Sequence, residues 1–443
     1  MPGLGFLKSI WDVSIAGRGS RERIRRLQET RLKSLLRHVL ASSRFYRELY
    51  RENGVAPEHA ALADLPVIDK KLMMDRYDDL VCDPALDKRS LESFLAEPWR
   101  QGTRYKGRYH ALHSSGTTGA PAIFAYGPRD WDTLKAIVAV RVLRARPSWL
   151  GRTRLAYIGA ADGHYAGISL AAEAARPFKA LLALHIGDPH ASLVSRLRAF
   201  QPHVLTGYSS AIALLAKEQE KGALGISPER VICSGDPLTP EIREAARRAF
   251  GVEPVGFYAA SESIGMGAEC RRGNLHLFDD LHCFEVVDED LKPVPPGRPG
   301  TLLLTNLYNL TQPLIRYRLN DRLVLAEEGC ACGWPFLTAR PVEGRQEELL
   351  WFGGEYVHPI AVAEIYIPGL ERFQVERTGP SSLLLRAVVA EGAVPESVLS
   401  ALRGRMAAIL EAKRLSGPVR IEARAVASIP NDPKTGKFRL ILP

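Results

Sequence analysis

Between residues 109 and 258, short runs rich in strand-forming side chains alternate with stretches of helical periodicity. The expected strands cover 109–113, 122–126, 155–159, 203–206, 230–233 and 255–258, and the expected helices cover 130–144, 191–200, 211–221 and 240–250. Strands that alternate with helices favour a layered α/β fold, because the connecting helices pack against the faces of the sheet. A chain of 443 residues is also too long for one simple core and suggests about two to three domains.

After about residue 283 the sequence predicts strands and turns, with PVPPGRPG at 293–300 as a clear turn cluster, and the pattern changes again after Gly344. Beyond this point the sequence predicts two strands, an amphipathic helix and a closing strand, at 373–377, 383–389, 398–410 and 419–425. This β-β-α-β order is enough for a small α+β domain. We therefore expect a large domain of layered sheets and helices over 1–343 and a small domain over 344–443.

The composition, 46% hydrophobic and 25% charged, is typical of a globular protein and excludes a disordered, collagen-like or coiled-coil chain. No stretch approaches roughly 20 uninterrupted apolar residues, and the first residues carry no cleavage signature, so we expect neither a membrane span nor a secretory leader. Six cysteines are too few for a disulfide scaffold and suit a reducing compartment. These features predict a cytoplasmic enzyme.

The formal net charge of +9 is compatible with nucleic acid, an anionic membrane or a phosphorylated small molecule as the partner. Residues 20 to about 80 are expected to be mostly helical, and the densest basic run, Arg18 to Arg37, reads as the solvated face of a helix. Aromatic residues do not interleave with this run as they would in a groove for single strands. We therefore expect a small-molecule partner rather than nucleic acid or a membrane, and a homodimer stays open.

The segment SSGTTG at 114–119 lies between two expected strands. Its glycines allow the backbone to turn so that several N–H groups face one concavity, and its hydroxyl groups add donors for phosphate oxygens. The segment is not a Walker loop, because no Lys-Ser or Lys-Thr follows it and the next element is an expected strand rather than a helix. An anion-binding loop is therefore favoured over the alternative, a polar hairpin turn.

Five segments, in this order, resemble the adenylate-forming superfamily of acyl-CoA synthetases and luciferases: SSGTTG, FYAASE at 257–262, PLIRYRLND at 313–321, GRQEE at 344–348 and TGKFR at 435–439. Further segments, at 27–50, 65–74, 201–216 and 234–243, are similar to the phenylacetate–CoA ligase branch. The resemblance covers essentially the whole chain. It implies the superfamily fold, in which a small mobile C-terminal domain rotates about a hinge residue, here Glu347.

The resemblance also implies a two-step reaction that uses ATP, Mg²⁺ and coenzyme A. A carboxylic acid, of the aryl or arylacetic type, attacks the α-phosphorus of ATP and releases pyrophosphate, and the CoA thiol then takes the acyl group from the acyl-adenylate. The alternative is an adenylate-forming enzyme that passes the acyl group to an amine, another nitrogen nucleophile or a carrier-protein thiol. Three departures from the superfamily pattern keep this alternative open: Ala120 where Lys is common, Ala259 where Gly is usual, and Leu319-Asn320 in place of Thr-Gly.

The same resemblance implies roles for individual residues. Lys437 would bridge the attacking carboxylate and the α-phosphate, with Lys434 as its competitor. Glu262 would ligate Mg²⁺, unless it is only a surface carboxylate at a helix start. Arg345, the third expected catalytic residue, would lie near the ribose or phosphate, unless it forms a plain salt bridge with Asp321. The implied nucleotide site is Ser114, Ser115, Gly116, Thr117, Thr118, Gly119, Ser234, Gly235, Asp236, Tyr258, Ala259, Ser261, Asp321 and Arg345.

The acyl pocket is expected between the segments 157–167, 207–208 and 259–266, where small residues leave room for an aromatic or moderately bulky acid. His164 and Tyr165 could hydrogen-bond a ring substituent, or they could belong to a loop that covers the cleft. The expected lining is Tyr157, His164, Tyr165, Gly207, Ala259, Ala260 and Ile264.

Several cysteine and histidine residues form a candidate metal site. Cys270 and His276 are followed, about fifty residues later, by Cys330-Ala331-Cys332-Gly333, and two sulfurs on a turn can face one ion. Some members of the resembled branch carry a structural zinc with this arrangement, so we expect Zn²⁺ on Cys270, His276, Cys330 and Cys332. The alternatives are His282 and Cys283 as ligands, or cysteines that are simply buried.

Overall fold

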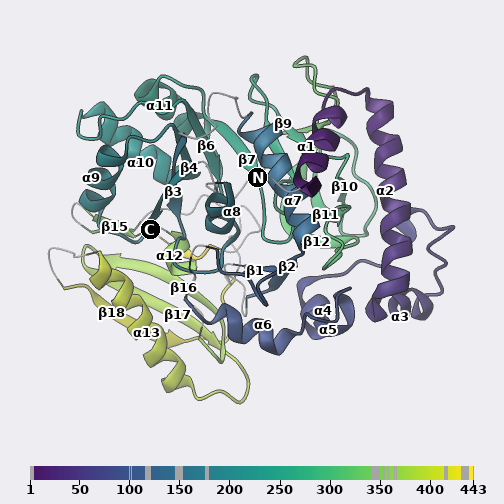
Figure 1. The fold of residues 1–443 in the computed structure, drawn as a ribbon. Helices are drawn as coiled ribbons and strands as arrows, with labels where there is room; N and C mark the ends of the chain where they lie inside the picture. The colour runs from purple at the N-terminus through teal and green to yellow at the C-terminus, as the bar shows by residue number, and fades with distance from the viewer. Residues whose placement is uncertain are drawn as a thin grey trace.

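The computed structural model describes residues 4–98, 100, 102–114, 121–144, 153–174, 179–340, 350–352, 355–357, 359–363, 365, 367–413, 418–430 and 439–442 (Figure 1). Its N-terminal part is helical, as the sequence predicts. The helices are α1 (Leu4–Ala16), α2 (Arg21–Ser42), α3 (Arg44–Glu52), a 3₁₀ turn (Leu62–Asp64), α4 (Lys70–Asp75), α5 (Tyr77–Leu80) and α6 (Lys88–Leu95). The basic run lies on α2, which buries Ile24, Leu35, Leu36 and Val39 and leaves most of its arginines on the outer side.

The centre of the fold is a sheet with the strand order β13-β9-β8-β7-β6-β5-β3-β4 among the described residues. Its strands are β3 (Thr153–Gly159), β4 (Lys179–His185), β5 (Val204–Tyr208), β6 (Arg230–Ser234), β7 (Val255–Tyr258), β8 (Gly267–Glu269), β9 (Leu275–Leu277) and β13 (Leu337–Ala339). The run from β4 to β7 is parallel, and the remaining strands are antiparallel. The α/β fold class predicted from the sequence is thereby confirmed.

Helices alternate with the parallel strands and pack beside them (Figure 1). They are α7 (Pro128–Ile137), α8 (Ala166–Ala174), α9 (His190–Phe200), α10 (Ser209–Glu220) and α11 (Pro240–Phe250). The start of α11 follows from its sequence, because the Thr239 hydroxyl accepts a hydrogen bond from Ile242 N and Pro240 occupies the first turn. The predicted helix over 130–144 is α-helical only to Ile137 and continues as a π-helical turn, Val138–Val142.

Two smaller sheets flank the central one. The hairpin β1 (His110–His113) and β2 (Ile123–Tyr126) is antiparallel and encloses the segment 114–122. A second sheet has the order β10-β11-β12, with β10 (His282–Val287), β11 (Pro299–Asn306) and β12 (Tyr317–Val324). Ile68, just before α4, forms a β-bridge with Tyr317 and so brings the start of α4 beside β12.

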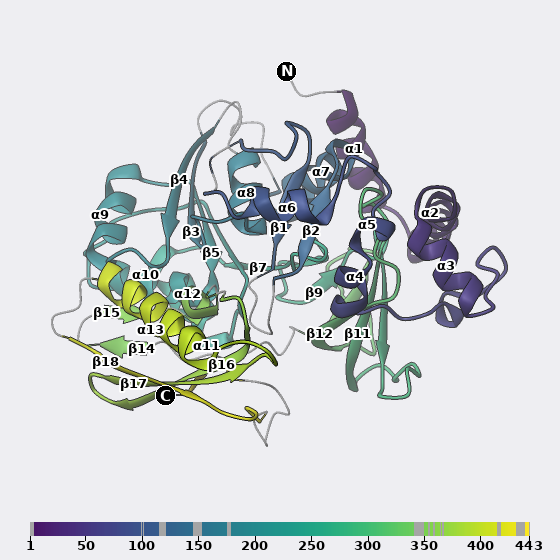
Figure 2. The same cartoon turned by 90° about the horizontal axis from the view of Figure 1, so that it is seen from below.

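The C-terminal part builds its own sheet, of order β18-β17-β16-β19, with one face covered by α13 (Figure 2). Its elements are β14 (Leu350–Phe352), β15 (Glu355–Val357), α12 (Pro359–Ala363), β16 (Leu370–Gly379), β17 (Ser382–Val389), α13 (Pro395–Ala412), β18 (Arg420–Ala425) and β19 (Ile441–Leu442). The four predicted elements of this region are present in the predicted order as β16, β17, α13 and β18, whereas β14, β15, α12 and β19 were not predicted. Its buried side chains form a hydrophobic cluster separate from those of the large sheet, which supports the proposed division near residue 344.

The two parts touch through a buried lysine. Lys413 Nζ, at the end of α13, donates hydrogen bonds to the carbonyl oxygens of Ile186 and Asp188 at 2.8 and 3.0 Å. His190 N, at the start of α9, donates to Glu355 Oε2 at 3.3 Å. Burial lowers the pKa of Lys413 to about 8, so this contact holds an amine in a poorly solvated place.

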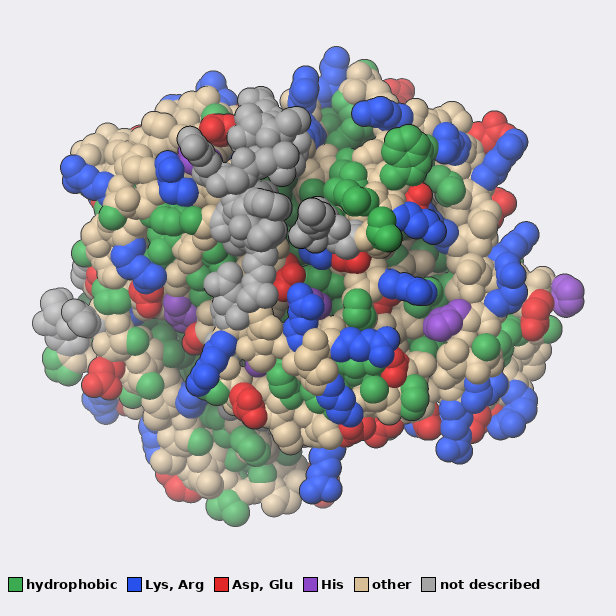
Figure 3. Space-filling view, viewed as in Figure 1, with side chains coloured by type: hydrophobic (Ala, Val, Ile, Leu, Met, Phe, Trp, Pro, Cys, Tyr) green, Lys and Arg blue, Asp and Glu red, His purple; other side chains and the backbone are tan. Residues whose placement is uncertain are grey.

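On the face of the molecule seen in Figure 3, lysine and arginine side chains are scattered among acidic and apolar ones rather than gathered in a single stripe. The basic side chains on this face therefore do not form one continuous positive patch. Across the described residues, no helix combines the length and the apolar character that crossing a bilayer requires.

Candidate functional site

Several of the nucleotide and acyl residues expected from the sequence lie at the carboxyl ends of the parallel strands. Gly207 and Tyr208 end β5, Ser234 ends β6, and Tyr258 ends β7, with Ala259 to Glu262 following it. Ligands of open α/β sheets bind at such carboxyl ends, because the loops there diverge and leave a crevice. The structure thus collects, at one edge, residues that lie more than 50 positions apart in the sequence.

Asp236 is held by the start of α10. Its carboxylate accepts hydrogen bonds from the backbone N–H groups of Ser209 and Ser210 and from the Ser210 hydroxyl, and the Ser209 hydroxyl donates to its carbonyl oxygen. Gly235 has φ +81°, and a side chain there would meet the ring of Tyr208. Since the Asp236 carboxylate already caps a helix, the segment 234–236 is suited to line a base with its backbone rather than with that carboxylate.

Glu262, Asp321 and Tyr258 form the polar centre of the site. Tyr258 Oη donates a hydrogen bond to Asp321 Oδ2 at 2.8 Å, so strand β7 and strand β12 meet here. Burial, together with the negative charge of Asp321, raises the pKa of Glu262 to about 7, whereas a backbone hydrogen bond and the charge of Lys70 oppose the shift. Two carboxylates in one poorly solvated place repel each other, and a bound cation would stabilise both. Carboxylate oxygen is the ligand that Mg²⁺ prefers.

Lys70 is a residue of this centre that the sequence did not reveal. It opens α4 directly after the capping residue Asp69, and burial lowers the pKa of its ammonium group while the charge of Glu262 raises it. Two backbone hydrogen bonds anchor the preceding residue Ile68 to β12, one from Ile68 N to Arg316 O and one from Arg318 N to Ile68 O. No local pattern could have found the pairing of Lys70 with Glu262, because the two residues lie almost 200 positions apart.

The structure describes the neck of the glycine-rich loop, and residues 115–120 lie outside the described residues. Ser114 N donates to Ala122 O, and Ala122 N donates to Ser114 Oγ, both at 2.9 Å. Ser114 therefore closes the hairpin at the base of the loop. Outside the described residues lie Ser115, Gly116, Thr117, Thr118, Gly119, Ala120, Arg345, Glu347, Lys434 and Lys437.

The expected acyl-pocket residues lie close to this edge. The hydroxyl of buried Tyr157 occupies the space that a side chain at Gly159 or Gly167 would need, so these glycines make room for its ring. His164 is nearly buried, Nε2 lies 3.1 Å from the carbonyl oxygen of Glu97, and its ring packs on Phe94. This contact gives His164 a structural partner in the segment that follows α6.

The remaining pocket residues differ in their exposure. Tyr165 packs edge-on against His113 at the end of β1, with ring centroids 4.4 Å apart. Ala259 and Ala260 are half-buried, whereas Ile264 is only 1% exposed and belongs to the main hydrophobic cluster. Among these three, Ala259 and Ala260 are therefore the ones whose side chains are open to a ligand.

The four expected zinc ligands come together on the described part of the chain. The candidate ligand atoms of Cys270, His276, Cys330 and Cys332 all lie within 4.8 Å of one another. Cys270 Sγ is 3.7 Å from Cys330 Sγ, and Cys332 Sγ is 3.3 Å from His276 Nε2. Three sulfurs and one imidazole nitrogen are the donor set of a closed structural zinc site.

Hydrogen bonds to the sulfurs fit the same interpretation. Arg272 N donates to Cys270 Sγ, Asn274 Nδ2 to Cys330 Sγ and Trp334 N to Cys332 Sγ, at 3.2 to 3.4 Å. Such donors favour the thiolate form that a metal requires. The alternative ligands are placed elsewhere: the His282 ring contacts Ser263, and Cys283 is buried in the main hydrophobic cluster.

Comparison with known proteins gives a consistent result, although no family model matches the chain. The chain is similar to a phenylacetate–coenzyme A ligase of Thermus thermophilus, with 31% identity over 364 residues, or 78% of this chain and 76% of the relative. It is 28% identical to a ligase of the same name from Escherichia coli over 361 residues, covering 77% and 76%. A solved structure of 2-hydroxyisobutyryl-CoA ligase with 2-HIB-AMP and CoA superposes with a TM-score of 0.63 at 22% identity, over 96% of this chain and 91% of that one, which shows a shared fold.

Proposed function

The chain belongs to the phenylacetate–coenzyme A ligase family, and from that premise we propose the residues, the metal ions and the class of acid with which it works. As an AMP-forming acid–CoA ligase, it activates a carboxylic acid as an acyl-adenylate and transfers the acyl group to coenzyme A. The observation that carries the assignment of residues is the meeting of Glu262, Asp321 and Tyr258 at the carboxyl edge of the parallel strands.

In the first step, the loop 114–119 would bind the outer phosphates, and Glu262 would hold the Mg²⁺, which would supply charge neutralisation there. Asp321, which already accepts one hydrogen bond from Tyr258, accepts further ones from the ribose hydroxyls. The ammonium group of Lys437 stabilises the negative charge that develops between the acid and the α-phosphate. The small domain then rotates about Glu347 so that the CoA thiol reaches the acyl carbonyl.

The proposed acid is of the aryl or arylacetic type. The support is the name of the similar relatives, which act on phenylacetate, together with the half-buried Ala259 and Ala260 at the end of β7. Pyrophosphate release measured over a panel of aryl, arylacetic and short aliphatic acids tests the proposal. Preference for an aliphatic acid would contradict the acid class, and turnover with an amine in the absence of CoA would contradict CoA as the acceptor.

Lys70 supplies a cation that the glycine-rich loop lacks, since Ala120 stands where a lysine is common. Lys70→Met is expected to slow pyrophosphate release by roughly ten- to a hundredfold, because a poorly solvated ammonium group beside Glu262 would no longer stabilise phosphate charge. The matched control is Lys71→Met, whose exposed ammonium group pairs only with Asp75 among the described residues. Equal rates for the two variants would contradict the role of Lys70.

Zinc is proposed at Cys270, His276, Cys330 and Cys332, in a structural role. Protein prepared without added metal is expected to hold about one zinc per chain by elemental analysis. Cys332→Ser should lose most of it and unfold at a lower temperature, because three ligands bind far more weakly than four. Cys283→Ser, at a buried cysteine outside the cluster, should keep its zinc; a wild-type content near zero would contradict the proposal.

A cytosolic location is part of the same proposal. None of the six cysteines, all of which lie among the described residues, forms a disulfide bond, and cysteines without disulfides suit a reducing compartment.

A further inference from the structure

Next to Glu262, three buried polar side chains form a chain of hydrogen bonds across three elements. Ser263 Oγ lies 2.9 Å from His282 Nε2, at the start of β10, and Asn306 Nδ2, at the end of β11, lies 2.9 Å from Ser263 Oγ. All three residues are 0% exposed. Buried polar groups are costly unless paired, so this arrangement holds its members in defined orientations.

The direction of each hydrogen bond follows from the partners at the two ends. His282 Nδ1 lies 3.0 Å from the carbonyl oxygen of Phe278, which can only accept, so Nδ1 carries the proton and Nε2 is a bare acceptor. The Ser263 hydroxyl must then donate to Nε2, and its oxygen accepts from the Asn306 amide. The Asn306 oxygen in turn accepts from the backbone N–H groups of Tyr308 and Asn309, both at 3.0 Å.

A serine and a histidine at this distance would form a nucleophilic pair in a hydrolase, but here the pair has a different use. Neither side chain is exposed, so no substrate carbonyl can reach the Ser263 oxygen. Burial also lowers the pKa of His282 to about 4, which agrees with a neutral ring. The pair is therefore a fixed structural connection beside the site rather than a reacting group.

The backbone on both sides of Glu262 is held as well. Tyr126 Oη, at the end of β2, donates to the carbonyl oxygen of Ser261 at 3.1 Å, and the Tyr308 hydroxyl donates to the carbonyl oxygen of Ile264. Both tyrosines are buried. Residues 261, 263 and 264 thus each have a fixed partner, and Glu262 lies between them.

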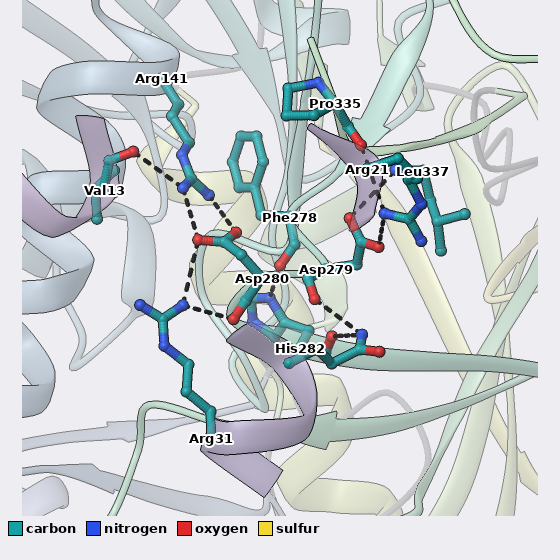
Figure 4. A network of polar contacts seen from close by, with 11 residues as sticks. Val13, Arg21, Arg31, Arg141, Phe278, Asp279, Asp280, His282, Pro335 and Leu337 are labelled. Atoms are coloured by element: carbon teal, nitrogen blue, oxygen red, sulfur yellow. Dashed lines mark hydrogen bonds and ion pairs between the residues drawn. The ribbon is translucent and has the colours of Figure 1, made fainter. Parts of the chain in front are cut away.

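The far end of the chain of hydrogen bonds is anchored in a buried ionic network (Figure 4). Arg141, on the π-helical turn, binds both carboxylate oxygens of Asp280 at 2.8 Å, and Arg31 of α2 contacts the same carboxylate. Arg21 pairs with the neighbouring Asp279. The turn from Phe278 to His282 is thereby tied to two helices and can serve as a rigid support for the His282 ring.

We propose that Ser263, His282 and Asn306 are positioning residues, which hold the Glu262 carboxylate in the orientation that the metal–nucleotide complex requires. The proposal rests on the proposed function, in which Glu262 is the Mg²⁺ ligand. Metal binding depends strongly on such outer partners, because the ligand must point at the ion before the ion arrives.

The test compares two buried serines. Ser263→Ala removes the central hydroxyl, and Ser43→Ala removes an equally buried one, which hydrogen-bonds to the carbonyl oxygen of Asp79 in the N-terminal helices. Calorimetric titration without any acid should show that Ser263→Ala weakens the binding of ATP with Mg²⁺ by roughly tenfold, while Ser43→Ala leaves it unchanged. With a chelator in place of Mg²⁺, both variants should bind ATP as the wild-type enzyme does.

The outcomes distinguish a wrong positioning role from a wrong proposed function. If Ser263→Ala binds ATP with Mg²⁺ normally and only its unfolding temperature falls, the positioning role is wrong and the function stands. If the wild-type enzyme binds no ATP and releases no pyrophosphate with any acid, the proposed function fails and this inference fails with it. Should Ser263→Ala not fold, Tyr126→Phe removes only the hydroxyl that holds Ser261 and must show the same magnesium-specific loss; normal binding by this variant would overturn the proposal.

Discussion

Replacing Lys437 by alanine is expected to slow adenylate formation by about a hundred- to a thousandfold, the usual effect of removing a group that stabilises transition-state charge. The reason is that, in the proposed mechanism, its ammonium group neutralises the charge that builds between the attacking carboxylate and the α-phosphate. The same substitution should leave the transfer of a preformed acyl-adenylate to CoA nearly unchanged, because that step occurs after the small domain has rotated. Exchange of labelled pyrophosphate into ATP measures the first step, and thioester formation from synthetic acyl-adenylate measures the second.

The neighbouring Lys434 provides the control for this experiment. It lies in the same turn-rich segment and carries the same charge, but the order Gly436-Lys437 is the one that resembles the superfamily loop. Lys434→Ala should therefore keep both rates close to those of the wild-type enzyme. A large loss of exchange in Lys434→Ala with normal exchange in Lys437→Ala would reverse the assignment.

Replacing Glu262 by glutamine is the second substitution with a large expected effect. The amide keeps the size of the side chain but removes the charged oxygen that Mg²⁺ prefers. We expect pyrophosphate release to fall by about a hundredfold and the half-saturating Mg²⁺ concentration to rise. Glu262→Asp, which keeps the charge but shortens the side chain, should lose less; if the glutamine variant were as active as the wild type, Glu262 would not be the metal ligand.

The same substitution should stabilise the folded protein, in a way that depends on pH. Burial raises the pKa of Glu262 from its ordinary value to about 7, so the folded state binds more protons than the unfolded state between these two values. The carboxylate therefore costs stability above pH 7 and costs none below pH 4.5. Without metal and nucleotide, Glu262→Gln should unfold at a higher temperature than the wild type at pH 8 and at the same temperature at pH 4.5. An increase of equal size at both values would mean that burial of the charge is not the cause.

The sequence predicted the architecture well, because strand and helix patterns are local. The six strands and four helices expected between residues 109 and 258 are present within a few residues of their predicted ends. The exception is the end of the helix predicted over 130–144, where a π-helical turn places Arg141 against Asp280. The buried ion pair joins Arg141 to a residue 139 positions away, and the periodicity of the helix itself does not indicate such a contact.

In the candidate site, the residues that lie in short motifs could be predicted from the sequence. The residues that contact them in the folded protein could not. Glu262, Asp321 and Tyr258 were expected because each belongs to a recognisable segment, and the structure brings Tyr258 and Asp321 into contact. Lys70 was missed, since its segment has no motif that points to phosphate. Lys437, Arg345 and the loop 115–119 stay predictions, because they lie outside the described residues.

By itself, the order of residues determined which segments become strands and helices, where the chain changes from one domain pattern to the next, and which types of side chain are available for chemistry. These properties depend on neighbours within about one or two turns of chain, which a linear pattern records. Only the tertiary structure decided that the charge of Glu262 acts on Lys70, and that Ser263, His282 and Asn306 join in one chain of hydrogen bonds. Such contacts depend on which strands become neighbours in a sheet, and that choice is made by the packing of the whole core.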